Sequence, residues 1–293
     1  MCIRDSIANG AALTAIFAAG VAVGIICGAL DLSIPGVAAL SSCACALLMT
    51  HGVPVWLGIL VGLVLGILVG CANGLISLRG FNPIIVTIGT LSVTSGLAAV
   101  LAGGYTIPGL DGLSFMGTRR YAGIPAPVWI VAALFLAGTV FLTRTRDGIR
   151  MMAVGGNAEA VRRSGIHSDR YKVLGFMISG FCSALGGLVT AALVTEANPS
   201  ASTGIIFDAL TAVALAGVAL SGGRGSLPRV LVGALILATI SNGLTIKGIQ
   251  PYWATITTGV LLLVSLGLEK WVSTTVSRRL VVSAQASVHT GTR

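Results

Sequence analysis

The sequence predicts an all-α, polytopic helical membrane protein. Of its 293 residues, 55% are hydrophobic and only 9% are charged, and the mean hydropathy of +0.97 lies far above that of soluble globular domains. The 40 glycines are typical of membrane helices, because small residues let helix backbones approach closely. One membrane domain is the simplest organisation.

Nine apolar runs approach the length of about 20 residues that a spanning helix needs. They cover residues 11–30, 34–50, 54–76, 84–103, 126–143, 173–195, 205–221, 228–246 and 251–269. Two of these runs, 34–50 and 205–221, are short, so one of the two is a candidate half-helix or re-entrant segment. The expected number of spans is therefore nine, give or take one.

The connections between the runs predict the orientation, because Lys and Arg stay mainly on the cytoplasmic side of a membrane. Placing loop 144–172 in the cytoplasm puts 14 of the 18 basic residues there. The outer face keeps only Arg4, Arg119, Arg120 and Lys247. Residues 11–270 then form the membrane domain, and residues 271–293 form a basic cytoplasmic tail.

With nine spans and a cytoplasmic C-terminus, the N-terminus falls outside, although no signal peptide pattern precedes the first run. We therefore expect residues 1–10 to be a truncated or aberrant N-terminus that lacks a first helix. A miscounted helix is the alternative explanation.

Several classes of function find no support in the sequence. The three histidines are scattered, and five of the six cysteines lie in apolar runs without the spacing of a zinc site. No phosphate-binding loop is present, and the basic residues form no stripe interleaved with aromatics that would indicate nucleic-acid binding. We expect no catalytic residue, no metal site and no cofactor in this chain.

Two segments match each other closely. Residues 73–88 and 242–256 both contain Asn-Gly-Leu, a basic residue followed by Gly, then Pro and Thr-Ile, with identical spacing from the basic residue onward. The predicted topology turns the first copy at the cytoplasmic face and the second at the outer face, which indicates an inverted internal repeat. Asp31 and Asp208 are a weaker equivalent pair. Generic turn chemistry explains part of the match.

Glycines recur at every fourth position in the third run and give one face of its helix no side chains, so we expect close helix packing there. These glycines are Gly58, Gly62, Gly66, Gly70 and Gly74.

Two carboxylates lie at membrane depth, where an ionisable group is a functional candidate. Asp31 belongs to the stretch Asp31-Leu-Ser-Ile-Pro-Gly, which also suits the start of a helix, with Asp or Ser as the N-cap and Pro in the first turn. Asp208 lies inside an apolar run, and a structural role is the alternative there too.

Loop 144–172 contains a predicted short helix. Asn157 is a suitable N-cap, residues 158–163 favour helix, and Gly165 is a natural stop. A short helix that projects from the cytoplasmic face suits docking into a groove of a partner protein. A basic loop lying on anionic lipid headgroups is the alternative.

These patterns together resemble the permease subunits of bacterial ABC importers for ribose and related monosaccharides, in the branched-chain amino acid/ribose permease family. The resemblance covers residues 7–270, nearly the whole chain. It rests on Asp31-Leu32-Ser33, Asn73-Gly74, Asn82-Pro83 with Thr87-Ile88-Gly89-Thr90, Gly155-Gly156-Asn157-Ala158-Glu159-Ala160 with Ser164-Gly165-Ile166, and Gly222-Gly223-Arg224-Gly225. Pro35, where the family often has a small residue, is a departure.

The resemblance implies ten helices, a location in the bacterial inner membrane and a pore made by a homodimer or paired permease. It also implies a periplasmic substrate-binding protein and cytoplasmic subunits that bind ATP and Mg²⁺. It makes the loop a coupling segment for the ATPase, with Gly155, Gly156, Asn157, Glu159, Ala160, Arg163, Ser164 and Gly165 as contact residues. Asp31, Asn82 and Asp208 are expected near the substrate pathway.

The expected function is therefore ATP-driven import of a ribose-like monosaccharide, by alternating access that a partner ATPase drives. Permeases for nucleosides, autoinducer-2 or branched-chain amino acids share much of the pattern. An ion-coupled secondary transporter or a membrane scaffold without transport activity is the alternative from another class.

Overall fold

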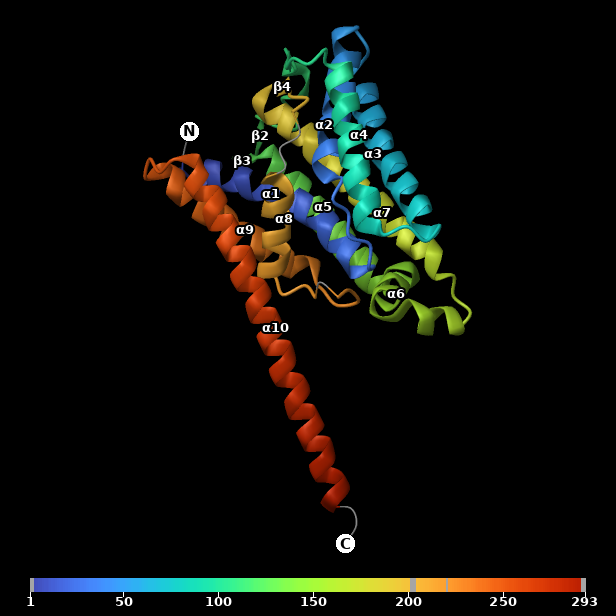
Figure 1. Cartoon of the computed structure of the whole chain (residues 1–293). Helices are drawn as coiled ribbons and strands as arrows, with labels where there is room; N and C mark the ends of the chain where they lie inside the picture. Colours follow the sequence, from blue (N-terminus) through green and yellow to red (C-terminus); the bar gives the residue numbers. More distant parts are fainter. Residues whose placement is uncertain (1–2, 201–203, 220, 291–293) are drawn as a thin grey trace.

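A computed structural model describes the backbone of residues 3–200, 204–219 and 221–290, and their side chains except Ile3, Pro251 and residues 272–290. Helices dominate this part of the chain (Figure 1). They are α1 (Ile3–Ile26), α2 (Ile34–Thr50), α3 (Val55–Leu78), α4 (Pro83–Leu101), α5 (Ala126–Arg144), α6 (Arg146–Arg163), α7 (Ser168–Val194), α8 (Gly204–Leu215), α9 (Leu227–Ile246) and α10 (Pro251–Thr290).

Each of the nine predicted apolar runs overlaps one helix. Among the described residues, seven helices are long and apolar enough to cross a membrane, and α2 and α8 are shorter. The 12 residues of α8 span about 18 Å at 1.5 Å per residue, well short of a hydrocarbon core of about 30 Å. The helix in the predicted run 205–221 is shorter than the run. It ends at Leu215, and Gly217 then adopts a φ of +67°.

The first helix also differs from the predicted run 11–30. It begins at Ile3 and includes Asp5, which forms an ion pair with Arg120. It ends at Ile26, because Gly28 has a φ of +73° and its amide turns back to the carbonyl of Ile25. Of the predicted aberrant N-terminus, residues 1 and 2 lie outside the described residues. In the predicted tail, the side chains beyond Trp271 lie outside them as well.

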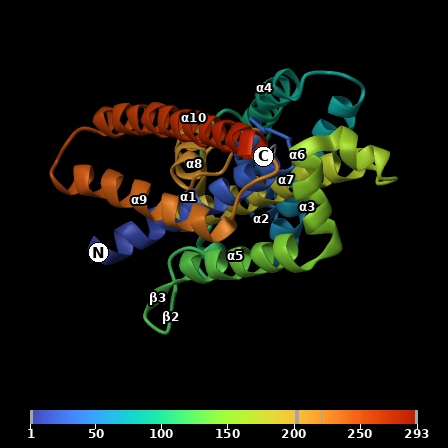
Figure 2. The ribbon, with the colours of Figure 1, turned by 90° about the horizontal axis from the view of Figure 1, so that it is seen from below.

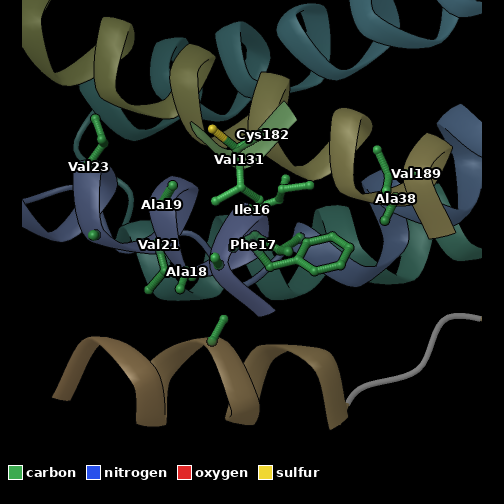
Figure 3. Close-up of a cluster of buried hydrophobic side chains, with 14 of the residues drawn as sticks. Ile16, Phe17, Ala18, Ala19, Val21, Val23, Ala38, Val131, Cys182 and Val189 are labelled. Carbon is green, nitrogen blue, oxygen red and sulfur yellow. The ribbon is translucent and has the colours of Figure 1, made fainter. Parts of the chain in front are cut away.

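The core is built around α1, which packs against α5, α7, α8 and α9, and around α2, which packs against α3, α4 and α7. Seen from below, α1, α2 and α7 lie between α5 on one side and α10 on the other (Figure 2). Buried side chains of α1, including Ile16 and Phe17, meet Val131 of α5 and Cys182 of α7 (Figure 3).

The glycine face of α3 is where this helix touches α2 and α7. The residues of α3 that are buried are the five glycines of the repeat and Asn73. A methyl group on Gly58 would lie 3.0 Å from Sγ of Cys45 on α2, whereas one on Gly74 would lie 2.9 Å from Cα of Val173 on α7. The opposite face exposes large apolar side chains such as Trp56 and Leu68, as expected for a surface against lipid.

The connections at the end opposite α6 contain short strands that the sequence did not indicate (Figure 1). Strand β1 (Ile107–Pro108) pairs with β4 (Glu196–Ala197), and β2 (Arg120–Tyr121) pairs with β3 (Ile124–Pro125), both antiparallel. The β2–β3 hairpin turns through Ala122 and Gly123, both with positive φ, as a two-residue hairpin turn requires. A short 3-10 helix, η1 (Asp111–Leu113), lies between β1 and β2.

Candidate functional site

A buried polar network centred on Asp31 joins four parts of the fold. One carboxylate oxygen accepts hydrogen bonds from the amide (2.9 Å) and the hydroxyl (2.6 Å) of Ser33, and the other accepts from the hydroxyl of Ser179 on α7 (2.8 Å). The amide of Asn73 on α3 donates to the Ser33 hydroxyl (3.0 Å), and Thr90 on α4 donates to Asn73 (2.6 Å). Asp31 is only 2% exposed, so its carboxylate faces the neighbouring helices.

The start of α2 explains how Asp31 reaches this position. Ser33 is the N-cap residue, but no side chain caps the helix, and a proline occupies the first turn. The prediction that Asp31 or Ser33 caps the helix through its side chain is therefore wrong. The carboxylate of Asp31 instead accepts from the amide of Ser33, two residues on, in an Asx-type turn.

Asp208 occupies a second, smaller polar contact. The hydroxyl of Thr258 on α10 donates to its carboxylate over 3.1 Å, and Thr211 donates to the backbone carbonyl of Thr258 over 3.4 Å. The side-chain oxygen of Asn242 on α9 is buried and has no hydrogen-bond partner among the described residues. Asp208 is partly exposed, so this contact is less enclosed than the Asp31 network.

A cavity of about 280 Å³ lies between α1, α2, α7 and α8. Its walls include Phe17 of α1, Pro35 of α2 and Thr190 of α7. Its lining also includes two polar side chains, Glu196 of β4 and Asn198 just after that strand. Pro35, noted above as a departure from the family pattern, therefore lines this cavity.

Asn82, also expected near the substrate pathway, is the N-cap of α4. Its side-chain oxygen accepts a hydrogen bond from the amide of Ile84 (2.9 Å), and Pro83 follows as the first residue of the helix. The residue is exposed in the short turn between α3 and α4. This placement separates Asn82 from the cavity lined by Pro35.

The predicted helix of loop 144–172 is present within a longer helix, α6, that is kinked at Asn157. Asn157 has non-helical backbone angles (φ −159°, ψ 91°), and its side-chain oxygen accepts a hydrogen bond from the amide of Ala160 (3.0 Å). It therefore caps the turn 158–163. Gly165 ends the turn with a φ of +80°, the left-handed conformation usual after a helix.

The half of α6 before the kink was missed by the sequence analysis. It starts at Arg146, and Thr145 caps it by accepting from the amide of Gly148 (3.0 Å). The sequence pattern that indicates this half-helix is Thr145 as an N-cap followed by Asp147 in the first turn. The glycine pair at 155 and 156, which favours a break, obscured that signal.

The short helix after the kink presents charged side chains to solvent. Glu159 forms ion pairs with Arg162 and Arg163, and all three side chains are exposed. Hydrogen bonds from Arg162 and then Arg163 lower the pKa of the Glu159 carboxyl, so the carboxylate is charged at neutral pH. Ser164 closes the helix by donating its hydroxyl to the carbonyl of Ala160 (3.0 Å). This arrangement can bind a partner through a charged, preformed helix.

Removing the cap is expected to loosen this helix. In the Asn157→Ala variant the amide of Ala160 loses its acceptor, which costs about 1 kcal/mol, or about a fivefold change in an equilibrium. Hydrogen exchange of residues 158–163 should therefore speed up about fivefold. Asn198→Ala is the control, because Asn198 also accepts from a backbone amide, that of Ser200, but in another loop. Unchanged exchange in Asn157→Ala would contradict the capping role.

Comparisons with known proteins agree with this architecture. Residues 3–266 match the family described as "Branched-chain amino acid transport system / permease component". The chain is similar to the ribose import permease protein RbsC of Bacillus subtilis, with 35% identity over 88% of this chain and 82% of that protein. It is also similar to the L-arabinose transport system permease protein AraH of Escherichia coli, with 31% identity over 83% of this chain and 75% of that protein.

A solved structure, PsaBC from Streptococcus pneumoniae in complex with Fab, shares the fold, with a TM-score of 0.54 and 17% identity over 89% of this chain and 90% of that chain. The family match extends over nearly the whole described membrane domain and includes both polar contacts and α6. The chain therefore belongs to the branched-chain amino acid transport system permease family, and it is a membrane transport component rather than a catalytic enzyme.

Proposed function

We propose that this chain is the membrane permease of an ATP-driven sugar importer for a ribose-like monosaccharide. The family and the similarity to permeases named for ribose and arabinose support the substrate class. The observation that carries the mechanism is the capped, charged helix 158–163 on α6. It lies at the end of the molecule away from the β2–β3 hairpin (Figure 1).

In this proposal, cytoplasmic subunits bind ATP and Mg²⁺ and dock onto helix 158–163. Their closing and opening moves α6, and the membrane domain alternates between outward and inward access. A periplasmic protein delivers sugar to the face that carries the cavity beside β4. Two copies of this chain, or this chain and a related permease, form the pore.

An inverted repeat gives this motion its symmetry. Thr90 follows Arg79 by the same number of residues as Thr258 follows Lys247. Each threonine is the donor in a contact between helices, Thr90 to Asn73 and Thr258 to Asp208. Threonines at equivalent positions that each join two helices support a duplication, in which α3–α4 and α9–α10 are the two copies. Their acceptors differ, because the counterpart of Asn73 is Asn242, whose side-chain oxygen has no hydrogen-bond partner among the described residues.

Reconstitution into proteoliposomes tests the transport proposal. Uptake of labelled ribose or arabinose is expected only when an importer ATPase, ATP with Mg²⁺ and a sugar-binding protein are all present. Omitting any one of them should abolish uptake. Uptake driven by a proton or sodium gradient without the ATPase would contradict the proposal and indicate a secondary transporter.

Charge reversal on α6 tests the docking helix. The Glu159→Arg variant replaces the partner of Arg162 and Arg163 with a third positive charge, so co-purification of the ATPase subunit should fall. Gly165→Trp should act similarly, because its left-handed φ disfavours any side chain. Arg119→Glu, in the connection before β2, is a control with a charge change of the same size and the opposite sign, and it should retain the ATPase. Equal retention in all variants would count against docking through this helix.

A further inference from the structure

Three segments meet at the end of α1. These are the last turn of α1, the residues of α6 just before its kink, and Gly222 and Gly223 in the connection that precedes α9. The described part of this connection, residues 221–226, reaches toward α6 in Figure 1. The last carbonyls of a helix have no partner within the helix. The carbonyl of Ile26, in the last turn of α1, instead accepts a hydrogen bond from the amide of Gly223 over 3.0 Å.

The three segments touch through backbone atoms. A methyl group on Gly155 would overlap the carbonyl oxygen of Ile26 and lie 2.8 Å from the amide nitrogen of Gly223. A methyl group on Gly222 would lie 2.8 Å from the carbonyl oxygen of Gly155. Gly222 and Gly223 also have φ values of +86° and +73°, which side chains disfavour. Any larger residue at Gly155, Gly222 or Gly223 would push the segments apart.

Such a contact transmits displacement well. Flexible side chains absorb small movements by changing rotamer, but closely packed backbones have no such freedom, and packed interiors pass strain on. Gly155 is separated only by Gly156 from Asn157, the cap of helix 158–163. A movement of that helix is therefore passed to the end of α1 through only two residues, Gly156 and Gly155.

From α1 the movement can reach the cavity. α1 packs against α5, α7, α8 and α9, and Phe17 on α1 and Ile205 on α8 both line the cavity beside Pro35. Gly222 and Gly223 lie shortly before the start of α9 at Leu227, so the same displacement reaches α9.

We infer that Ile26, Gly155, Gly222 and Gly223 form a glycine joint, which positions α1 and the α8–α9 connection according to the state of the docked helix 158–163. This inference rests on the proposed ATP-driven transport. It adds that the two glycine motifs of the sequence act together, one on each side of the end of α1. These residues are positioning residues, since they act through helices rather than on substrate.

The test separates coupling from docking. In the complete importer reconstituted in proteoliposomes, Gly155→Ala is expected to retain the ATPase subunit on co-purification but to lower ATP-dependent uptake of ribose or arabinose about tenfold or more, because overpacking displaces the segments. Gly10→Ala, whose added methyl would have no atom within 4 Å, is the control and should keep the wild-type rate.

Equal uptake by Gly155→Ala and Gly10→Ala would overturn the joint. A wild-type complex that retains no ATPase and imports no sugar would instead refute the proposed function, so the two failures are distinguishable. Loss of ATPase retention in Gly155→Ala, with retention kept in Gly10→Ala, would also overturn the joint, because Gly155 would then serve docking itself.

A second measurement uses the wild-type protein and so does not depend on whether a variant folds. In the wild-type complex in lipid nanodiscs, the amide of Gly223 should stay protected from hydrogen exchange both without nucleotide and with a non-hydrolysable ATP analogue, because its bond to Ile26 persists as the segments move together. Faster exchange at Gly223 on adding the analogue, with α6 still protected, would overturn the joint, since the loop would then separate from α1.

Discussion

The Gly70→Ala variant should lose much of its stability, because α3 and α7 touch at this point through their backbones. The added methyl would overlap the carbonyl oxygen of Phe176 and lie 3.0 Å from Cα of Met177. Neither atom can rotate away, so the helices must separate. We expect destabilisation by about 3 kcal/mol or more, at the upper end of the range for overpacked cores. The midpoint of thermal unfolding in detergent measures it.

Gly89→Ala on α4 is the matched control for this variant. A methyl group on Gly89 would meet no atom within 4 Å, and alanine favours helix over glycine by about 1 kcal/mol. Its unfolding midpoint should equal or exceed that of the wild type. If both variants unfold at the same temperature, the close packing of α3 on α7 does not govern stability.

Asp31→Ala should destabilise the membrane domain nearly as much. The substitution leaves the amide and hydroxyl of Ser33 and the hydroxyl of Ser179 without their acceptor in a buried site. Each unsatisfied buried donor costs about 1–3 kcal/mol, so a total loss of about 3 kcal/mol or more is expected. Thermal unfolding in detergent, compared with the wild type, gives the value.

Two variants control the interpretation of Asp31→Ala. Asp208→Ala removes an acceptor that has one donor among the described residues, Thr258, at a more exposed site. This variant should lose about 1 kcal/mol of stability. Equal losses in the two alanine variants would contradict the idea that Asp31 stabilises the fold by accepting hydrogen bonds from Ser33 and Ser179. Asp31→Asn keeps one acceptor oxygen and should fall between. If Asp31→Asn is as stable as the wild type but abolishes transport, Asp31 acts on the substrate pathway instead.

Some contacts of the predicted site residues could be predicted from the sequence and others could not, for a physical reason. Asn157 as a cap and Gly165 as a stop were predictable, because capping is decided by residues within a few positions of one another. The contact of Asp31 with Ser179 was not predictable, since Ser179 lies 148 residues away and no local pattern in α7 indicates it. Asn82 follows the local rule again: its polar side chain satisfies the adjacent helix start.

The length and hydropathy of the chain by themselves determined the helical membrane fold, the positions of its apolar helices, the glycine face of α3 and the short helix after Asn157. Each of these follows from a period or a capping pattern along the chain. Tertiary structure alone decided that Asp31 binds Ser179, that Asn73 binds Ser33, and that Gly155 meets Gly223 across the end of α1. Those outcomes depend on contacts between segments distant in sequence, which no local pattern encodes.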